Sequence, residues 1–365
     1  MPERASSSAV IYGLVADRSA WKWAAVLLQQ LKDVHSRVPA VVFNTTEMPE
    51  AASTSIAALG GRLMSLEPIM PVPEPFVKPL GHSHGKKPAW TKLALWGQPF
   101  ERIIYLDLDV VITQNVDHMA MFPGDTFSPE VCSFPPCTPD KAPGGINVGV
   151  MVIAPSPKRF ADLLEYSQRR AAELEAAEAD DLKHNVPLNV SRAEALGKRL
   201  VGSAEQSFIR EFHEDILHSS ITEMHEARRG WDWSVRSYTS SRPCDRLRTR
   251  AGHSKDETCT AGTVHVMSRR YNARPHDCGK CPMDSYEPLI VHYACSRKPW
   301  QTSRESWLTL SWCHGRTDGP VCWPCQANYT RMWYNAEDRM CKALAHKAPL
   351  ILPEFAACKS VIRRS

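Results

Sequence analysis

Two aspartates separated by one residue follow directly after an apolar run in this chain of 365 residues. The run Ile103 to Leu106 is typical of a buried strand, and the period of two along a strand places Asp107 and Asp109 on the same side. Two carboxylates at the end of a strand form a hard-oxygen site. Such a site suits Mg²⁺ or Mn²⁺, which keep coordination positions free for substrate phosphates.

The elements before this pair must place it at an edge of a sheet. An apolar run from Ala9 to Val15, helical spacing from Trp23 to Leu31 and the apolar residues 41–43 predict a strand, a helix and a strand. A second helix and strand are predicted within Ile56 to Ile69. This alternation favours a parallel sheet covered by helices, and open sheets of that kind bind ligands outside the carboxyl ends of their strands.

The pattern continues after the aspartates and then fades. Val148 to Ile153 predicts another buried strand, and a helix rich in Ala and Glu is predicted from about Lys158 to Lys183. Beyond Trp231 the sequence is rich in Cys, Trp, Pro and Arg, so we expect irregular structure there. The Trp-rich tail from Gln301 to Ser365 is expected to brace the core or to shape an acceptor site. One large α/β domain with an appendage fits this length.

The charge balance bears on the class of partner. The chain has 44 Lys and Arg against 40 Asp and Glu, a net charge of +4 that is spread along its length. It lacks the basic stripe that a nucleic-acid backbone requires, so we expect no nucleic-acid partner. The hydrophobic content of 43% and the charged content of 23% are typical of a globular protein.

Twelve cysteines are many for this length. The pairs Cys278/Cys281 and Cys322/Cys325 fit disulfide staples, a Cys₄ zinc site or a redox site. The distance between the pairs exceeds the usual zinc spacing, and no thioredoxin-like strand and helix flank them, so disulfides are favoured while zinc stays open. Ten of the cysteines lie in the last third of the chain: Cys244, Cys259, Cys278, Cys281, Cys295, Cys313, Cys322, Cys325, Cys341 and Cys358.

The cysteines and the sequons at Asn44, Asn189 and Asn328 favour an oxidising lumen, in the Golgi or elsewhere in the secretory pathway. However, residues 1–8 contain no apolar signal region, and no run approaches the ~20 apolar residues of a membrane helix. A membrane anchor is therefore not visible in this chain. A cytoplasmic protein with reduced or metal-bound thiols remains the alternative.

Further motifs accompany the aspartates: WTKLALW at 90–96, YLDLDVVITQNVD at 105–117, INVGVMVIAPS at 146–156, AEQSF at 204–208 and VHYACSRKPW at 291–300. In order and content they resemble glycosyltransferase family 8, the glycogenin and galactinol synthase group. The resemblance implies a GT-A (Rossmann-like) fold over residues 1–300, with a mixed, mostly parallel sheet and helices on both faces. Residues 301–365 would be a Cys/Trp-rich extension packed on that core.

Carried over to this sequence, the resemblance makes Asp107, Asp109 and His292 the metal ligands, with Asp107 also near the ribose. Lys298 would reach the diphosphate, and Lys92 would lie near the donor phosphates or sugar as a second cation. If His292 is a ligand, its ring nitrogen should lie within about 5 Å of a carboxylate oxygen of the pair.

The remaining implied roles concern the sugar and the base of the donor. Asn147, Gln206 and Glu205 would contact the donor sugar or flank the reacting carbon. The uracil ring would be faced by the first strand and the turn after it, through Ala9, Leu14, Val15 and Trp21.

The sequence departs from the family pattern at four positions. Val148 replaces a Ser, Glu205 replaces an Asp, Gly202 stands where glycogenin has an additional Asp, and Cys295 replaces a Gly. Glu205 keeps the charge but extends it by a methylene, a shift of a size that matters for the rate. The departures leave the donor sugar open.

The implied function is transfer of a hexose from a UDP-sugar to an acceptor hydroxyl, with retention and with Mn²⁺ (or Mg²⁺). The acceptor would be a glycan, a protein or a small polyol, and a cytosolic self-glucosylating primer protein is one possibility within the family. DLDVV also fits haloacid-dehalogenase phosphatases, in which Asp107 would attack phosphorus and Asp109 would act as acid and base. A catalytically silent sugar-binding protein is the third hypothesis, motivated by the altered residues Val148, Glu205 and Cys295.

Overall fold

The computed structural model describes residues 9–67, 90–129, 146–183, 205–216, 225–227, 235–239, 263–275, 288–294, 298–301, 303–305, 324–355 and 358. The strands are β1 Val10–Ala16, β2 Ala40–Asn44, β3 Arg62–Ser65, β4 Arg102–Leu106, β5 Val110–Ile112, β6 Thr126–Pro129, β7 Ile146–Ile153, β8 His225–Ala227, β9 Val235–Thr239, β10 Thr263–Met267 and β11 Ile290–His292. The helices are α1 Trp21–Asp33, α2 Glu50–Ala58, α5 Pro157–Lys183, α7 Glu205–Ile216 and α10 Pro324–Lys347. The 3₁₀ helices are η2 Lys92–Gly97, η3 Asp117–Met121, η4 Arg269–Tyr271, η7 Pro299–Gln301 and η9 Pro349–Glu354.

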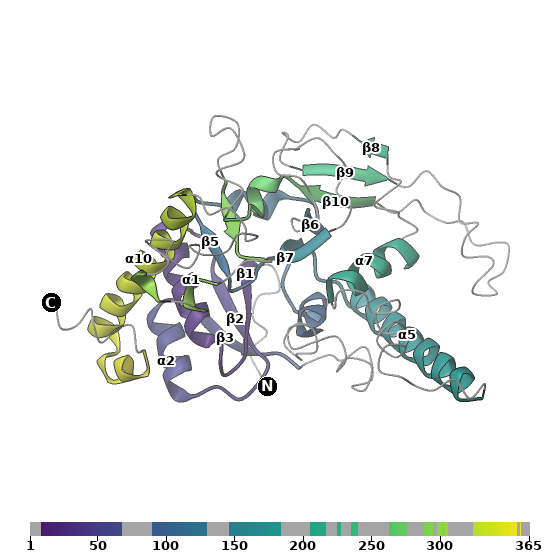
Figure 1. Cartoon of the computed structure of the whole chain (residues 1–365), viewed down its shortest axis with the longest axis horizontal. Helices are drawn as coiled ribbons and strands as arrows, with labels where there is room; N and C mark the ends of the chain where they lie inside the picture. The colour runs from purple at the N-terminus through teal and green to yellow at the C-terminus, as the bar shows by residue number, and fades with distance from the viewer. Residues whose placement is uncertain are drawn as a thin grey trace, which may run out of the picture.

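Among the described residues, the strands form one large and one small sheet. The large sheet has nine strands in the order β3-β2-β1-β4-β7-β6-β10-β9-β8 (Figure 1). Only β7 and β9 run antiparallel to their neighbours, so seven of these nine strands point in one direction. The small sheet is the antiparallel pair β5 and β11.

Helices cover both faces of the large sheet. On β4, Ile104 and Leu106 pack into a core shared with α1, α2 and α10, whereas Ile103 and Tyr105 pack into a core shared with η2, α5 and α7. Figure 1 shows α1 and α10 on one side of the sheet and α5 and α7 on the other. This confirms the predicted fold class, an α/β protein with a mixed, mostly parallel sheet between two helical layers.

The elements predicted near the amino terminus are present, but the second helix and the strand after it, α2 and β3, both begin earlier than predicted. The strand and the helix predicted over residues 9–31 are β1 and α1. The helix predicted to begin at Ile56 is α2, which begins six residues earlier, at Glu50. Small residues such as Ala52 and Ser55 form much of its buried face, so the apolar period was too weak to mark its start.

The prediction of irregular structure at the carboxyl terminus was wrong for α10. This helix of 24 residues packs along α1 (Figure 1), and its buried side chains follow helical spacing through Trp333, Ala336, Met340 and Leu344. The many Cys, Trp, Pro and Arg residues of this region made the helical spacing difficult to recognise in the sequence. Beyond Trp231, β9 and β10 also extend the large sheet. The proposed domain boundary at residue 300 stays a prediction.

One disulfide ties the carboxyl-terminal elements together. It joins Cys341 of α10 to Cys358, which follows η9. Cys278, Cys281 and Cys322 lie outside the described residues, so their pairing, and the zinc alternative with it, stays a prediction. Within the described ranges, no helix combines the length and the apolar composition that crossing a membrane requires.

Replacing Cys341 and Cys358 together by alanine should lower the free energy of unfolding by about 3 kcal/mol, the chain-entropy contribution of a disulfide that closes a loop of this size. The two cysteines are 17 residues apart. Urea denaturation of both proteins at one pH measures the difference. Peptide mapping of the denatured, unreduced wild-type chain is the control, because the linked peptide must be present. Equal free energies would contradict a stabilising role.

Candidate metal centre

The two aspartates lie where the chain passes from the large sheet to the small one. The backbone N–H of Asp107 donates to the carbonyl of Gly149 at 2.7 Å, which continues the pairing of β4 with β7. After Asp109 the chain enters β5, whose partner is β11, and Val110 lies opposite His292 in that pair. The backbone N–H of Tyr293 then donates to the carbonyl of Asp109 at 2.9 Å. Two strand pairings therefore bring the imidazole to the carboxylates.

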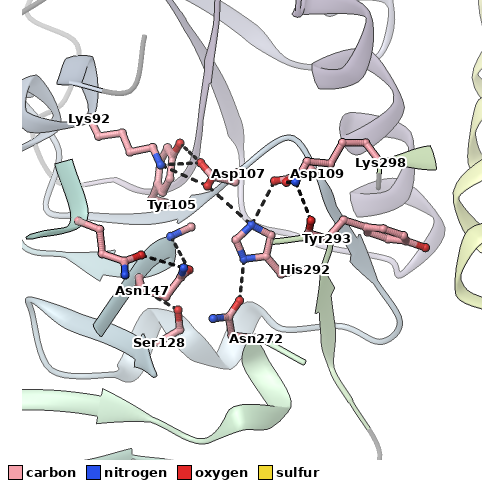
Figure 2. A network of polar contacts seen from close by, with 12 residues as sticks. Lys92, Tyr105, Asp107, Asp109, Ser128, Asn147, Asn272, His292, Tyr293 and Lys298 are labelled. Carbon is pink, nitrogen blue, oxygen red and sulfur yellow. Dashed lines mark hydrogen bonds and ion pairs between the residues drawn. The ribbon is translucent and has the colours of Figure 1, made fainter. Parts of the chain in front are cut away.

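Asp107, Asp109 and His292 each offer one ligand atom, and these atoms all lie within 4.8 Å of one another. The Nε2 of His292 lies 3.1 Å from an oxygen of Asp109 and 3.8 Å from an oxygen of Asp107. These distances are within the limit of about 5 Å expected for shared metal ligands. In Figure 2 the imidazole points toward both carboxylates. Two carboxylates and an imidazole suit Mn²⁺ or Mg²⁺, so the donor set fits the expected ion.

Asn272 fixes the tautomer of this histidine. Its side-chain oxygen lies 2.7 Å from Nδ1 of His292, and its side-chain nitrogen donates to the carbonyl of Pro129 at 3.0 Å. Because the amide nitrogen is committed to that carbonyl, the amide oxygen faces the imidazole and accepts from Nδ1. A neutral imidazole therefore keeps its proton on Nδ1 and presents the lone pair of Nε2 to the carboxylates. Sequence reasoning missed Asn272, because no local pattern marks it.

Gly149 leaves room for the centre within a buried strand. A β-carbon at this position would lie 2.2 Å from Cε1 of His292 and 2.8 Å from an oxygen of Asp107. Neither approach is possible without displacing a proposed ligand. Sequence reasoning gave Gly149 no role, although a glycine inside an apolar strand is a signal of close approach.

A lysine lies on each side of the centre (Figure 2). The Nζ of Lys92 is 2.9 Å from one oxygen of Asp107 and 3.2 Å from the other, and the hydroxyl of Tyr105 donates to Asp107 at 2.5 Å. The ammonium of Lys298 contacts the carboxylate of Asp109 and donates to the carbonyl of Tyr293 at 2.6 Å. Both lysines predicted from the sequence therefore lie against the carboxylates.

Asp109 is held in its ionised form. Burial by itself would raise the pKa of Asp109, but the imidazole of His292 and the ammonium of Lys298 outweigh burial and hold that pKa well below its usual range. The carboxylate is therefore charged at neutral pH, as a metal ligand must be.

The predicted sugar-binding residues form a second group beside the centre. The side-chain nitrogen of Asn147 donates to Gln206 of α7 at 2.9 Å, and its side-chain oxygen accepts from the backbone N–H of Gly149 at 2.9 Å. Asn147 is thereby hydrogen-bonded to Gly149, the residue whose lack of a side chain leaves space for His292. Glu205 begins α7, but its side chain is not among the described parts of the structure, and Gly202 and Cys295 lie outside the described residues.

The residues predicted to face uracil are placed less well for that role. Ala9 precedes β1. Val10 pairs in parallel with Arg102, the first residue of β4, so Ala9 lies at the amino ends of the strands, whereas Asp107 lies at their carboxyl ends. Leu14 is fully buried in the core against the α1 layer. Neither position fits a ligand at the carboxyl ends, so the expectation is corrected for these two. Val15 lies near that end of β1, and Trp21 is buried edge-on against Phe355.

Replacing Gly149 by alanine should weaken Mn²⁺ binding, because the added methyl group displaces His292 or Asp107. Overpacking of this kind also lowers the free energy of unfolding by about 1 to 3 kcal/mol. Val152→Ala in the same strand is the matched control, since it loses packing but keeps the centre free. Mn²⁺ titration followed by electron paramagnetic resonance compares them, and equal affinities for the wild type and Gly149→Ala would count against the site.

Asn272→Ala should lower the affinity for Mn²⁺ by about 10- to 100-fold, the range observed when the group that orients a metal-bound histidine is removed. The physical reason is that both tautomers and other ring orientations of His292 become accessible. The same titration measures the affinity, and circular dichroism checks that the fold is kept. An unchanged affinity would mean that Asn272 does not control the imidazole.

Comparison with known proteins finds similarity to solved structures alone. No protein-family model and no curated protein matches the sequence. Among solved structures, the chain is similar to the galactosyltransferase LgtC in complex with donor and acceptor sugar analogues, with 14% identity and a TM-score of 0.41 over 89% of this chain and 95% of that one. It is also similar to the glycosyltransferase GlyE of Streptococcus pneumoniae, with 15% identity and a TM-score of 0.41 over 97% of this chain and 64% of that one. A third is the bifunctional glycosyltransferase WbbM, at 10% identity and a TM-score of 0.39 over 82% of this chain and 48% of that one. At such values the function has to be argued from the site itself.

Proposed function

We propose that the protein is a metal-dependent glycosyltransferase that moves a hexose from a UDP-sugar to an acceptor hydroxyl, with Mn²⁺ (or Mg²⁺) as cofactor. The observation that carries this proposal is the convergence of Asp107, Asp109 and His292 within 4.8 Å at the carboxyl end of β4. Ligands of α/β sheets bind at that end of the strands. The motif resemblance described above supports the same reaction.

The charges of the centre favour a diphosphate ligand. The carboxylates of Asp107 and Asp109 are balanced by the ammonium groups of Lys92 and Lys298, each of which contacts one of them. A divalent cation added to this balanced group leaves two positive charges. The diphosphate of a nucleotide-sugar carries two negative charges at neutral pH and restores the balance. A neutral sugar without a diphosphate would leave the two positive charges unbalanced.

Each side chain of the site would have a separate role in such a reaction. A bound Mn²⁺ would act as a Lewis acid that stabilises the charge developing on the leaving diphosphate. Lys298 can exchange its contact with Asp109 for a phosphate oxygen, and Lys92 can do the same on the side of Asp107. Asn147 and Gln206, which are hydrogen-bonded to each other, would bind sugar hydroxyls.

The phosphatase hypothesis fits the site less well. It requires Asp107 as a nucleophile, yet this carboxylate accepts from Tyr105 and contacts Lys92. It also gives no role to His292 or to Asn272, which orients His292. A catalytically silent sugar-binding protein has the same site geometry, and only an activity measurement separates it from the transferase.

The stereochemistry, the acceptor and the location complete the proposal. Retention of anomeric configuration and the acceptor class (glycan, protein or small polyol) are supported by the motif resemblance alone. A location in the Golgi or elsewhere in the secretory pathway is supported by the Cys341–Cys358 disulfide, because disulfides persist in oxidising compartments. A cytoplasmic location is the alternative.

Asp109→Asn should abolish Mn²⁺-dependent release of UDP while leaving the fold intact, because it removes a ligand charge without changing the shape of the side chain. The wild-type protein is incubated with a panel of UDP-sugars and Mn²⁺, and UDP release and intact protein mass are measured. We expect release with at least one sugar, and a loss of at least about 100-fold in the variant.

Asp162→Asn is the matched control, because it makes the same change on the surface of α5, where Asp162 pairs with the exposed Lys158. It should behave as wild type. Full activity of Asp109→Asn with an unchanged circular dichroism spectrum would refute the metal assignment. If the wild type binds UDP-sugar and Mn²⁺ but releases no UDP with any sugar or acceptor, the silent binding protein is the better description.

A further inference from the structure

A separate pocket of about 1030 Å³ lies between α1, α10 and η9. Its size is at the upper end of the range typical of small-molecule sites. None of the three proposed metal ligands lines it. The short segment Lys298–Gln301 lies between the two sites, since Lys298 contacts Asp109 while Trp300 lines the pocket. The proposed transfer reaction gives this pocket no role.

Three tryptophans form one wall of the pocket. The rings of Trp23 and Trp300 are stacked, with centroids 4.5 Å apart and an angle of 11° between their planes. The ring of Trp333 lies 6.0 Å from Trp23 and 5.9 Å from Trp300. Trp23 and Trp300 are only partly buried, so this cluster presents flat aromatic surface to the pocket.

Hydrogen-bond donors and acceptors both lie beside this surface. The indole N–H of Trp333 is buried and has no hydrogen-bond acceptor among the described residues, which is unusual for a buried donor. Arg304 also lines the pocket, and Asp338 fixes its guanidinium through two hydrogen bonds of 2.8 and 2.7 Å. Burial and the neighbouring Asp338 raise the pKa of Glu337 to about 7, although Arg304 opposes this. Near neutral pH, Glu337 can therefore accept or donate a hydrogen bond.

We propose that this pocket is a second carbohydrate-binding site, distinct from the metal centre. A sugar ring has an apolar face of C–H groups that packs flat on tryptophan, and a rim of hydroxyls that both donate and accept hydrogen bonds. The pocket offers a partner for each: the Trp23 and Trp300 rings for the face, and Arg304 and Glu337 for the hydroxyls. A nucleobase can stack on the same rings, so displacement by uridine distinguishes it from a sugar.

Isothermal titration with maltotriose, lactose and mannotriose tests the proposal. EDTA is present throughout, so that the metal centre does not contribute. The wild type should bind at least one of the three. Trp300→Ala removes the stacking surface and should weaken that binding by at least about tenfold, as expected for an aromatic anchor. Trp333→Phe keeps a ring but shortens the aromatic wall that supports Trp23 and Trp300, and it should also weaken binding. Glu337→Met, which keeps the length of the side chain and the packing of α10 but removes its hydrogen-bonding oxygens, should do the same.

Trp90→Phe is the matched control. Trp90 is also fully buried, with an indole N–H that has no partner among the described residues, but it belongs to the core on the other face of the sheet. Its replacement should leave saccharide binding unchanged. The proposal is overturned if none of the three saccharides binds, or if the binding is insensitive to all three pocket variants. It is equally overturned if uridine displaces the saccharide, or if Asp109→Asn abolishes the binding. A failure of the UDP-release assay has no bearing on these results.

Discussion

The antiparallel pairing of β5 with β11 is the constraint on which the candidate centre depends. Asp107 and Asp109 follow β4 in the sequence, whereas His292 is far along the chain and reaches them only because β11 pairs with β5. This pairing also allows the backbone N–H of Tyr293 to donate to the carbonyl of Asp109. The backbone therefore sets the separation of imidazole and carboxylates before any side chain is oriented. Gly149, on the neighbouring β7, leaves the space that this arrangement needs.

Two carboxylates held this close repel one another, so the centre requires compensating charge. Asp107 and Asp109 each contact a lysine, and Asp109 also contacts His292. Lys92 comes from η2 on one face of the sheet, whereas Lys298 comes from the segment just before η7, beside α10. The site thus receives one cation from each side of the large sheet. When a metal and a diphosphate bind, these lysines have new partners within the same site, so their charges need not be left unpaired.

Short-range patterns were sufficient to predict much of this arrangement. The spacing of apolar residues predicted the strand before Asp107 and Asp109 and the alternation of β1, α1 and β2. The motif that contains His292 and Lys298 identified the site residues that are far from the aspartates in the sequence. The misses share a physical reason. Asn272 and Gly149 act through tertiary contacts that leave no local period, and α10 was hidden because its buried face is built from Trp, Ala, Met and Leu within a Cys-rich stretch. Ala9 and Leu14 were misplaced because strand direction and facing depend on sheet register.

The carboxyl-terminal helix is more than a cover for α1, because it holds the segments that carry His292 and Lys298. The hydroxyl of Tyr293, next to His292, is hydrogen-bonded at 2.8 Å to Thr330 of α10. The hydroxyl of Tyr334, one turn further along α10, donates at 2.9 Å to the carbonyl of Pro299, next to Lys298. Both bonds are buried, and an unmade buried bond is costly, so displacement of α10 would move both segments. The same helix forms a wall of the tryptophan-lined pocket. The shape of that pocket and the position of Lys298 therefore depend on the same helix.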